Sequence, residues 1–295
     1  MLKEKLITAV LIVLAFELMA YFPDDFQEAK KLFNTHKNKE AQEVFQKLAS
    51  TAPTPESKAK CLSYAAKALG RDKTQYEAAM EAAKKIKDRE ISVLARIDIM
   101  KENHKIRACL DEFKDEDFEG WSDVHRLKAC IELGGLALSL GRHDAAQNYS
   151  LKAIEISGSD SRSRILALGI LNAVYFAAED YENVLKTSNR ILAMKEFNGF
   201  FPFSQAVLIR SQALLRLGKP DEAAETLKIV DQMKRTSPNY KCQVLIIRGD
   251  VHAARGEMDE AAAMYKGVMT LNENNDVADS LIKQARSKLA TLNRE

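Results

Sequence analysis

The sequence predicts an all-α protein, an α-solenoid in which antiparallel helical hairpins stack along the chain. A helix, turn and helix in "LSLGRHDAAQNYSLKAI", which starts at Leu138, return as "AARGEMDEAAAMYKGVM", which starts at Ala253. Glycine (12 residues) and proline (6 residues) are scarce. They separate apolar runs with a period of about 3.6 residues, which is typical of helices and not of short, closely turned strands.

Residues 1–20 are expected to be a secretory signal peptide or an N-terminal membrane anchor. "MLKEK" supplies two lysines, "LITAVLIVLAFELMA" is almost wholly apolar, and "YFPDDF" is polar with a proline. Cleavage after Ala20 would leave Tyr21 as the mature start. The alternative is a buried first helix of the stack in a cytoplasmic protein, because the run is short for a span of ~20 residues and contains Glu17.

Residues 21–274 are expected to form about seven hairpins, strong in 121–274 and degenerate in 21–120. The predicted turn residues of the strong copies are Gly141, Glu179, Gly218 and Gly256, at steps of 38, 39 and 38. Residues 275–295 have no partner hairpin and predict a C-terminal capping helix, which a solenoid needs to cover its last core surface.

The degenerate copies are placed by extending the same step backwards. It reaches a turn at Asn103, with Ala108 where the strong copies have Ala146, Ala223 and Ala261. Two weaker copies are predicted around 36–53 and 74–86, and the step from Thr74 to Asn103 is short, at 29.

Small residues are expected where the two helices of a hairpin meet, because they allow a close antiparallel approach. The predicted pairs are Gly134 with Ala146 and Gly249 with Ala261.

These positions resemble the tetratricopeptide repeat. The family's pattern falls on Leu133, Gly134, Ala137, Gly141, Ala146 and Ala153 in one copy, and on Gly249, Gly256, Ala261 and Tyr265 in another. The resemblance implies a right-handed superhelix whose concave groove is lined by the first helix of each hairpin. It also implies binding of another protein or peptide. The family's unit is 34 residues, so the longer steps here indicate longer helices or loops.

The groove positions implied by the family are mainly apolar, with a few amides. They predict binding of an apolar or amphipathic peptide or helix. A clamp for a peptide's terminal carboxylate is not favoured, because Lys128 alone matches the family's clamp residues. The candidate groove residues are Lys128, Ile131, Leu138, Phe176, Leu208, Gln212, Leu215 and Ile246.

Four phenylalanines crowd a Gly and Pro break in "KEFNGFFPFSQ", residues 195–205. We expect this segment to pack under a repeat junction, and the alternative is an exposed contact loop formed by Phe197, Phe200, Phe201 and Phe203. The second functional hypothesis uses this loop or the convex face. The protein would then be a structural subunit of an assembly in the cell envelope.

Composition and motifs argue against several other functions. The formal charge is +2, so nucleic acid is not an expected partner. The cysteines Cys61, Cys109, Cys130 and Cys242 lack metal-site spacing and are expected to be small buried residues. No phosphate loop, metalloprotease, hydrolase or kinase motif occurs, so we expect no cofactor, metal or catalytic residue. An enzyme hidden at 103–121, where the repeat fails, is the third hypothesis.

Overall fold

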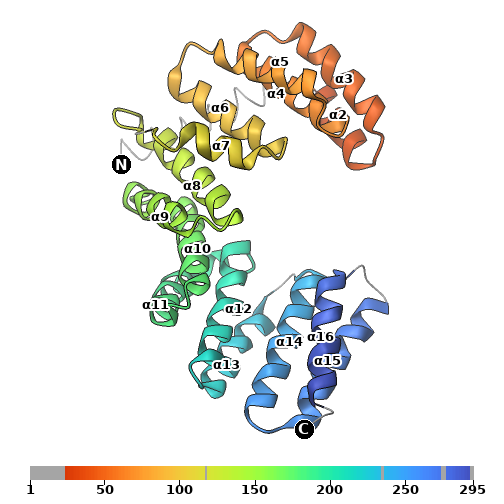
Figure 1. Cartoon of the computed structure of the whole chain (residues 1–295), viewed down its shortest axis with the longest axis vertical. Coiled ribbons are helices and arrows are strands. Elements are labelled where there is room, and N and C mark those ends of the chain that lie inside the picture. The colour runs from red at the N-terminus through yellow and green to blue at the C-terminus, as the bar shows by residue number, and fades with distance from the viewer. Residues whose placement is uncertain (1–23, 117, 234–235, 274–276, 293–295) are drawn as a thin grey trace. The chain divides into compact units, whose positions relative to one another are not determined.

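The computed structural model describes residues 24–116, 118–233, 236–273 and 277–292, and every regular element in these ranges is a helix (Figure 1). The chain divides into two compact units, Met1–Leu136 and Ala137–Glu295. The boundary falls within helix α8 (Asp123–Ser139). The predicted signal peptide or anchor at 1–20 lies outside the described residues.

In the first unit, each helix from α2 (Asp24–Asn34) to α7 (Ile106–Phe113) contacts the next one along the chain, and α4 (Pro55–Ala68) also contacts α6 (Arg89–Glu102). Helices that alternate in this way form stacked antiparallel hairpins, with the first helices of successive hairpins side by side. Before α8, the unit contains α2 (Asp24–Asn34), α3 (Asn38–Thr51), α4 (Pro55–Ala68), α5 (Lys73–Lys84), α6 (Arg89–Glu102) and α7 (Ile106–Phe113).

The second unit repeats this arrangement. Here α12 contacts both α10 and α14, so the first helices again lie side by side. Its helices are α9 (His143–Ile156), α10 (Ser161–Ala177), α11 (Tyr181–Leu192), α12 (Phe201–Arg216), α13 (Pro220–Leu227), α14 (Pro238–Ala254), α15 (Met258–Glu273) and α16 (Asp279–Leu292), with short 3-10 helices η1 (Lys195–Phe197) and η2 (Lys228–Gln232).

The last helix, α16, packs against both α14 and α15. It therefore occupies the place that the first helix of a further hairpin would take. Ile282 and Ala285 are buried in the cluster that it shares with α14 and α15. On its more polar side, Lys288 Nζ lies 2.7 Å from Asp250 Oδ1 of α14.

The seven hairpin turns found in the described ranges share one backbone geometry. One residue has a positive φ, and the next N–H donates to the carbonyl oxygen five residues earlier, as Arg142 does to Ala137 at 2.9 Å and Lys219 to Leu214 at 2.9 Å. This is the Schellman end of a helix. The positive-φ residues are His36, Gly70, His104, Gly141, Glu179, Gly218 and Gly256, which confirms the four turn residues predicted for the strong copies.

Of the degenerate copies, the one predicted from His36 starts at an observed turn, but the turns expected at Thr74 and Asn103 are wrong. The first three turns lie at His36, Gly70 and His104, at regular steps of 34. Thr74 lies inside α5, and Asn103 precedes the left-handed residue by one position. The short step of 29 therefore does not exist, because the second turn lies at Gly70, four residues before Thr74.

After six of the seven turns, the fifth residue packs in the core, and after the Gly70 turn it is the half-buried Gln75. The six core residues, all fully buried, are Ala41, Cys109, Ala146, Val184, Ala223 and Ala261. In the third hairpin this residue is therefore Cys109, and the predicted Ala108 is exposed.

All four cysteines are buried, as predicted. Burial raises the pKa of the Cys61 thiol to about 11. Burial, and next the charge of Glu112, raise the pKa of Cys109 to about 12. The thiols therefore stay protonated and behave as small apolar groups.

Gly249 was predicted to pack against Ala261, but the side chain closest to it is the ring of Tyr265. A Cβ on Gly249 would overlap the Tyr265 side chain of α15. Tyr265 lies in this space and donates its hydroxyl to Asp250 Oδ1 at 2.7 Å. In the α10–α11 hairpin the equivalent positions are Asn172 and Ser188, and the Ser188 hydroxyl donates to Asn172 Oδ1 at 3.1 Å.

We predict that Glu179→Gly raises the free energy of unfolding by about 0.5–1 kcal/mol, because Glu179 has φ 58° at a turn where three of its counterparts in the second unit are glycine. Urea unfolding of the full chain measures this change. The matched control is Gly141→Ala, where no atom lies within 4 Å of the added Cβ, so backbone strain alone should act. It should lower stability by about 1 kcal/mol. A lower stability of Glu179→Gly would contradict the prediction.

Candidate functional site

The first helices of the hairpins present equivalent side chains ten, six and three residues before each turn residue. These positions lie on one side of a helix, and we call their surface the first-helix face. In the second unit they are Leu138 on α8, Gly169, Ala173 and Phe176 on α10, Leu208, Gln212 and Leu215 on α12, and Ile246, Asp250 and Ala253 on α14. In the first unit they are Phe26, Lys30 and Phe33 on α2, Lys60, Tyr64 and Lys67 on α4, and Leu94, Asp98 and Lys101 on α6.

In the second unit, the structure divides the candidate groove residues into two groups. Leu138, Phe176, Gln212 and Leu215 are half-buried, so part of each side chain meets solvent. These four keep an apolar and amide surface at the first-helix face.

Leu208 and Ile246 belong to the second group, and placing them on the groove surface needs correction. Leu208 is 4% exposed and Ile246 is 2% exposed. Leu208 packs in one core cluster with Leu227 and Tyr240, and Ile246 packs in another with Tyr265. Neither side chain can contact a peptide while the core stays packed.

In the first unit, Lys128 and Ile131 lie on α8 next to an ion-pair network with α6. Lys128 Nζ lies 3.4 Å from Asp98 Oδ2, and Lys101 Nζ lies 3.3 Å from Asp98 Oδ1 and 2.8 Å from Glu132 Oε2. Burial lowers the pKa of Lys101, but Glu132 and Asp98 outweigh it and leave that pKa raised. Lys101 therefore stays charged within the network, while Ile131 is half-buried.

Hydrogen bonds at the start of α6 fix this helix against α8. Glu90 Oε2 accepts hydrogen bonds from the Ser122 hydroxyl at 2.7 Å and lies 2.7 Å from His125 Nδ1. Burial raises the pKa of Glu90, but these bonds exceed that effect and the pKa is lowered. The carboxylate is therefore ionised at neutral pH, and it orients α6 and α8.

The first unit also has a distinctive surface that its sequence did not predict. Three lysines lie over aromatic rings of α2 and α4. Lys30 Nζ is 5.7 Å from the Tyr64 ring centroid, Lys60 Nζ is 5.6 Å from that of Phe26, and Lys67 Nζ is 5.5 Å from that of Phe33. We call these six residues the lysine–aromatic patch. A turn placed at Gly70 would have revealed it, because Lys60, Tyr64 and Lys67 stand at the three groove positions before that glycine.

The rings of the patch continue into the core. Phe26 and Phe45 have centroids 5.3 Å apart at an interplanar angle of 66°, and Phe26 and Tyr64 lie 5.4 Å apart at 76°. Edge-to-face packing of this kind is favourable and restricts the rings. The three ammonium groups of the patch therefore lie over aromatic rings, and packing restricts the Phe26 and Tyr64 rings.

The phenylalanine-rich segment is only partly a loop, since η1 contains Phe197 and α12 begins at Phe201. The expected burial holds for Phe203, which is 3% exposed, and in part for Phe197 and Phe200, which pack against the same cluster. Phe201 is 71% exposed. The segment thus combines a core anchor with one solvent-facing ring.

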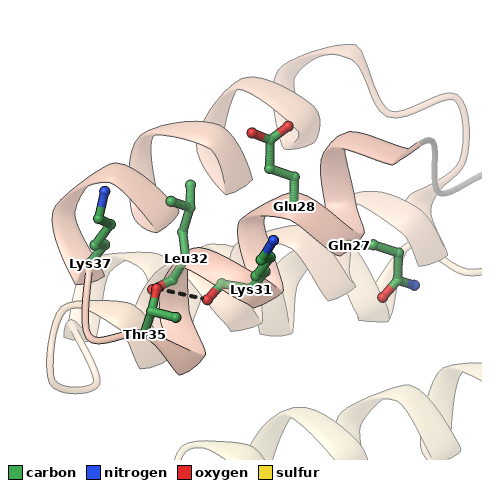
Figure 2. A pocket seen from close by; sticks show the side chains of 6 residues that line it. All are labelled: Gln27, Glu28, Lys31, Leu32, Thr35 and Lys37. Atoms are coloured by element: carbon green, nitrogen blue, oxygen red, sulfur yellow. Dashed lines mark hydrogen bonds between the residues drawn. The ribbon is translucent and has the colours of Figure 1, made fainter.

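Figure 2 shows an open pocket beside α2. In it, the Thr35 hydroxyl donates to the Lys31 carbonyl oxygen at 3.0 Å. Five of the six lining side chains are exposed, and none is buried. The lining residues are Gln27, Glu28, Lys31, Leu32, Thr35 and Lys37. The pocket is an open surface hollow, and none of its lining residues belongs to the patch.

Within the described ranges, no helix is both long enough and apolar enough to cross a lipid bilayer. In the same ranges, no group of three or more His, Cys, Asp or Glu side chains is arranged to hold a metal ion.

Comparison with known proteins agrees with the repeat pattern. A tetratricopeptide-repeat model matches residues 127–160, and a second model of this repeat matches 204–228 and 243–265. Among curated proteins, none matches the sequence.

Two solved structures share the architecture. A tetratricopeptide repeat protein from Parabacteroides merdae has a TM-score of 0.53 at 14% identity, covering 90% of this chain and 99% of the other. The C-terminal part of a TPR repeat-containing protein from Cytophaga hutchinsonii has a TM-score of 0.51 at 16% identity, covering 88% and 98%. At these identities the likeness shows the fold alone. The chain thus contains tetratricopeptide repeats and has the all-α solenoid fold of tetratricopeptide-repeat proteins.

Proposed function

We propose that this protein is a non-enzymatic scaffold that binds an apolar or amphipathic peptide or helix of another protein on the first-helix face of its second unit. Tetratricopeptide-repeat proteins generally mediate protein–protein interactions. The observation that carries the proposal is the half-buried set Leu138, Phe176, Gln212 and Leu215. Aliphatic and aromatic side chains can cover apolar groups of a ligand, while the Gln212 amide can pair with its backbone.

The region 103–121, where the predicted repeat pattern fails, supports a structural role over the enzyme hypothesis. Phe118 and Trp121 are buried there, with ring centroids 4.9 Å apart at 74°. Departures from a repeat often mark functional sites. Here the departure places an aromatic pair in the core, so we propose no catalysis by this region.

We predict that Leu138→Asp with Leu215→Asp removes partners captured from the native host, because two carboxylates would be desolvated against an apolar ligand. The measurement is affinity capture with mass spectrometry, alongside circular dichroism to verify folding. The matched control, Leu151→Asp with Leu217→Asp, adds the same charge at exposed leucines and should keep the partners.

Gln212→Glu serves as a second variant, since it keeps the size of a half-buried side chain. Partner sets that are identical for wild type, the double aspartate variant and Gln212→Glu would rule out this face.

The second candidate function is that of a structural subunit of a cell-envelope assembly, which docks through the convex face or the segment 197–203. It is favoured by the exposure of Phe201, which is 71% exposed beside the half-buried Phe197 and Phe200. A ring this exposed at the start of a helix is available to a partner.

We predict opposite outcomes for two phenylalanines of this segment. Phe203→Ala should lower the free energy of unfolding by about 3–5 kcal/mol, since it removes a buried ring. Phe201→Ala should change stability by less than about 0.5 kcal/mol but reduce self-association or subunit binding in sedimentation velocity. Unchanged association with Phe201→Ala would argue against the docking role.

We also propose that residues 1–20 direct export to the periplasm, as a cleaved signal or an anchor that faces it; the alternative remains a cytoplasmic protein. We predict that protein recovered from the envelope fraction of a native host begins at Tyr21 if the signal is cleaved or at Met1 if it is retained, as read by N-terminal sequencing. Deleting 1–20 removes Lys3, Glu4, Lys5 and Glu17, which leaves the net charge unchanged. Full-length protein confined to the cytoplasm would contradict export.

A further inference from the structure

We propose that two copies of this chain associate through residues 195–201 of the second unit, with the Phe201 ring of each copy packed against Phe197 and Phe200 of the other. Arg162 and Glu196 would form ion pairs across the same contact. This inference rests on the second candidate function, docking through the segment 197–203, and it names the docking partner as a second copy of the chain.

The exposed ring of Phe201 is not required by the hairpin fold. Phe201 is 71% exposed, whereas the other exposed large apolar side chains of the described residues are at most 46% exposed. It stands 17 residues before the turn residue of its hairpin. The equivalent residues of the neighbouring hairpins, Arg162 on α10 and Asn239 on α14, are exposed and polar. Because the fold accepts a polar residue here, an exposed phenylalanine indicates a contact outside the chain.

The residues beside Phe201 form an apolar surface that can receive such a ring. Phe197 and Phe200 are half-buried, with ring centroids 5.9 Å apart at an interplanar angle of 43°. Both pack against the core cluster that contains Phe203. Between them, no atom lies within 4 Å of the place where Gly199 would carry a Cβ. One copy therefore offers both a projecting ring and an apolar surface to receive one, as a twofold contact between identical chains requires.

Two opposite charges at this surface have no ion-pair partner within one copy. The Arg162 guanidinium lies 5.1 Å from the centroid of the Phe200 ring, and Glu196 directly precedes Phe197. Both side chains are exposed. Among the residues that the structure describes, no ion pair includes Arg162 or Glu196. A twofold contact places Arg162 of each copy beside Glu196 of the other, so the charges complement each other twice.

The same charges favour a second copy over an anionic lipid surface. Arg162 and Lys195 would be attracted to acidic head groups, but the carboxylate of Glu196 next to the rings would be repelled. A second copy satisfies charges of both signs.

The contact is small, so the dimer should be weak. A whole aromatic side chain buries about 150–250 Å², and four of the six rings are already half-buried. The total is well below the roughly 1,200–2,000 Å² of a stable interface. We expect a dissociation constant of about 10–100 μM.

Sedimentation velocity of the full chain between about 1 and 300 μM should show a reversible monomer–dimer equilibrium. Phe201→Ala should raise the dissociation constant at least about tenfold. The matched control is Leu151→Ala on α9, which removes another exposed apolar side chain of the same unit and should change the constant by less than about twofold. Circular dichroism verifies that each variant is folded.

Charge exchange tests whether Arg162 and Glu196 meet between copies. Arg162→Glu alone brings two carboxylates together, and Glu196→Arg alone brings two guanidinium groups together, so each variant should dimerise at least about tenfold more weakly. An equimolar mixture of the two variants restores both ion pairs in the mixed dimer and should recover the wild-type constant within about threefold. Mixing cannot relieve a charge effect confined to one copy.

A second pair of variants controls for net charge. Glu182→Arg and Arg190→Glu change exposed residues of α11 by the same charges. Neither variant nor their mixture should change the dissociation constant by more than about twofold.

Four results would overturn the proposal. They are a wild-type monomer at every concentration, equal dimerisation of wild type and Phe201→Ala, a mixture as weak as its single variants, and binding of monomeric protein to phosphatidylglycerol vesicles that Phe201→Ala abolishes. If wild type is monomeric but loses an envelope partner on Phe201→Ala, the second copy is excluded and the docking function stands. Capture with the Leu138 and Leu215 variants decides the groove function separately, because neither residue belongs to the segment 195–201.

Discussion

The hairpins depend on one backbone conformation, the left-handed residue that ends each first helix. It reverses the chain within a few residues and sets which side of the second helix faces the first. His36, His104 and Glu179 adopt this conformation without the advantage of glycine. These three turns persist because packing on both sides fixes them, as at the fully buried Ala41, Cys109 and Val184, five residues further on. At these turns, the backbone conformation therefore depends on the packing of the second helix against the first.

Much of the second unit could be predicted because its turn residues are three glycines and one glutamate, spaced 38 or 39 residues apart along the sequence. The first unit has the same hairpin fold, but its sequence does not mark the turns with glycine, because histidine stands at two of the three. The same lack of signal concealed the lysine–aromatic patch, whose residues are recognisable only once Gly70 is placed. Burial of Leu208 and Ile246 could not be predicted, because it depends on side chains from the neighbouring hairpin, such as Tyr240.

The two units carry different chemistry on equivalent positions. Six residues before the turn, the first unit has Lys30, Tyr64 and Asp98, and the second has Ala173, Gln212 and Asp250. The scaffold accommodates different contacts at this position, since Tyr64 packs its ring on Phe26 whereas Asp250 pairs with Lys288 of the last helix. The surface chemistry of the two units can thus differ although both are built from stacked hairpins.

The placement of the cysteines has a consequence for studying motion. Three of them lie in the first unit, and Cys242 alone lies in the second. A buried thiol reacts with an alkylating reagent only when its surroundings open. The rate of alkylation at Cys109 would therefore report local opening of the α6–α7 hairpin, and the rate at Cys242 that of the α14–α15 hairpin. The two native cysteines thus allow the local opening of the two units to be measured separately in one protein.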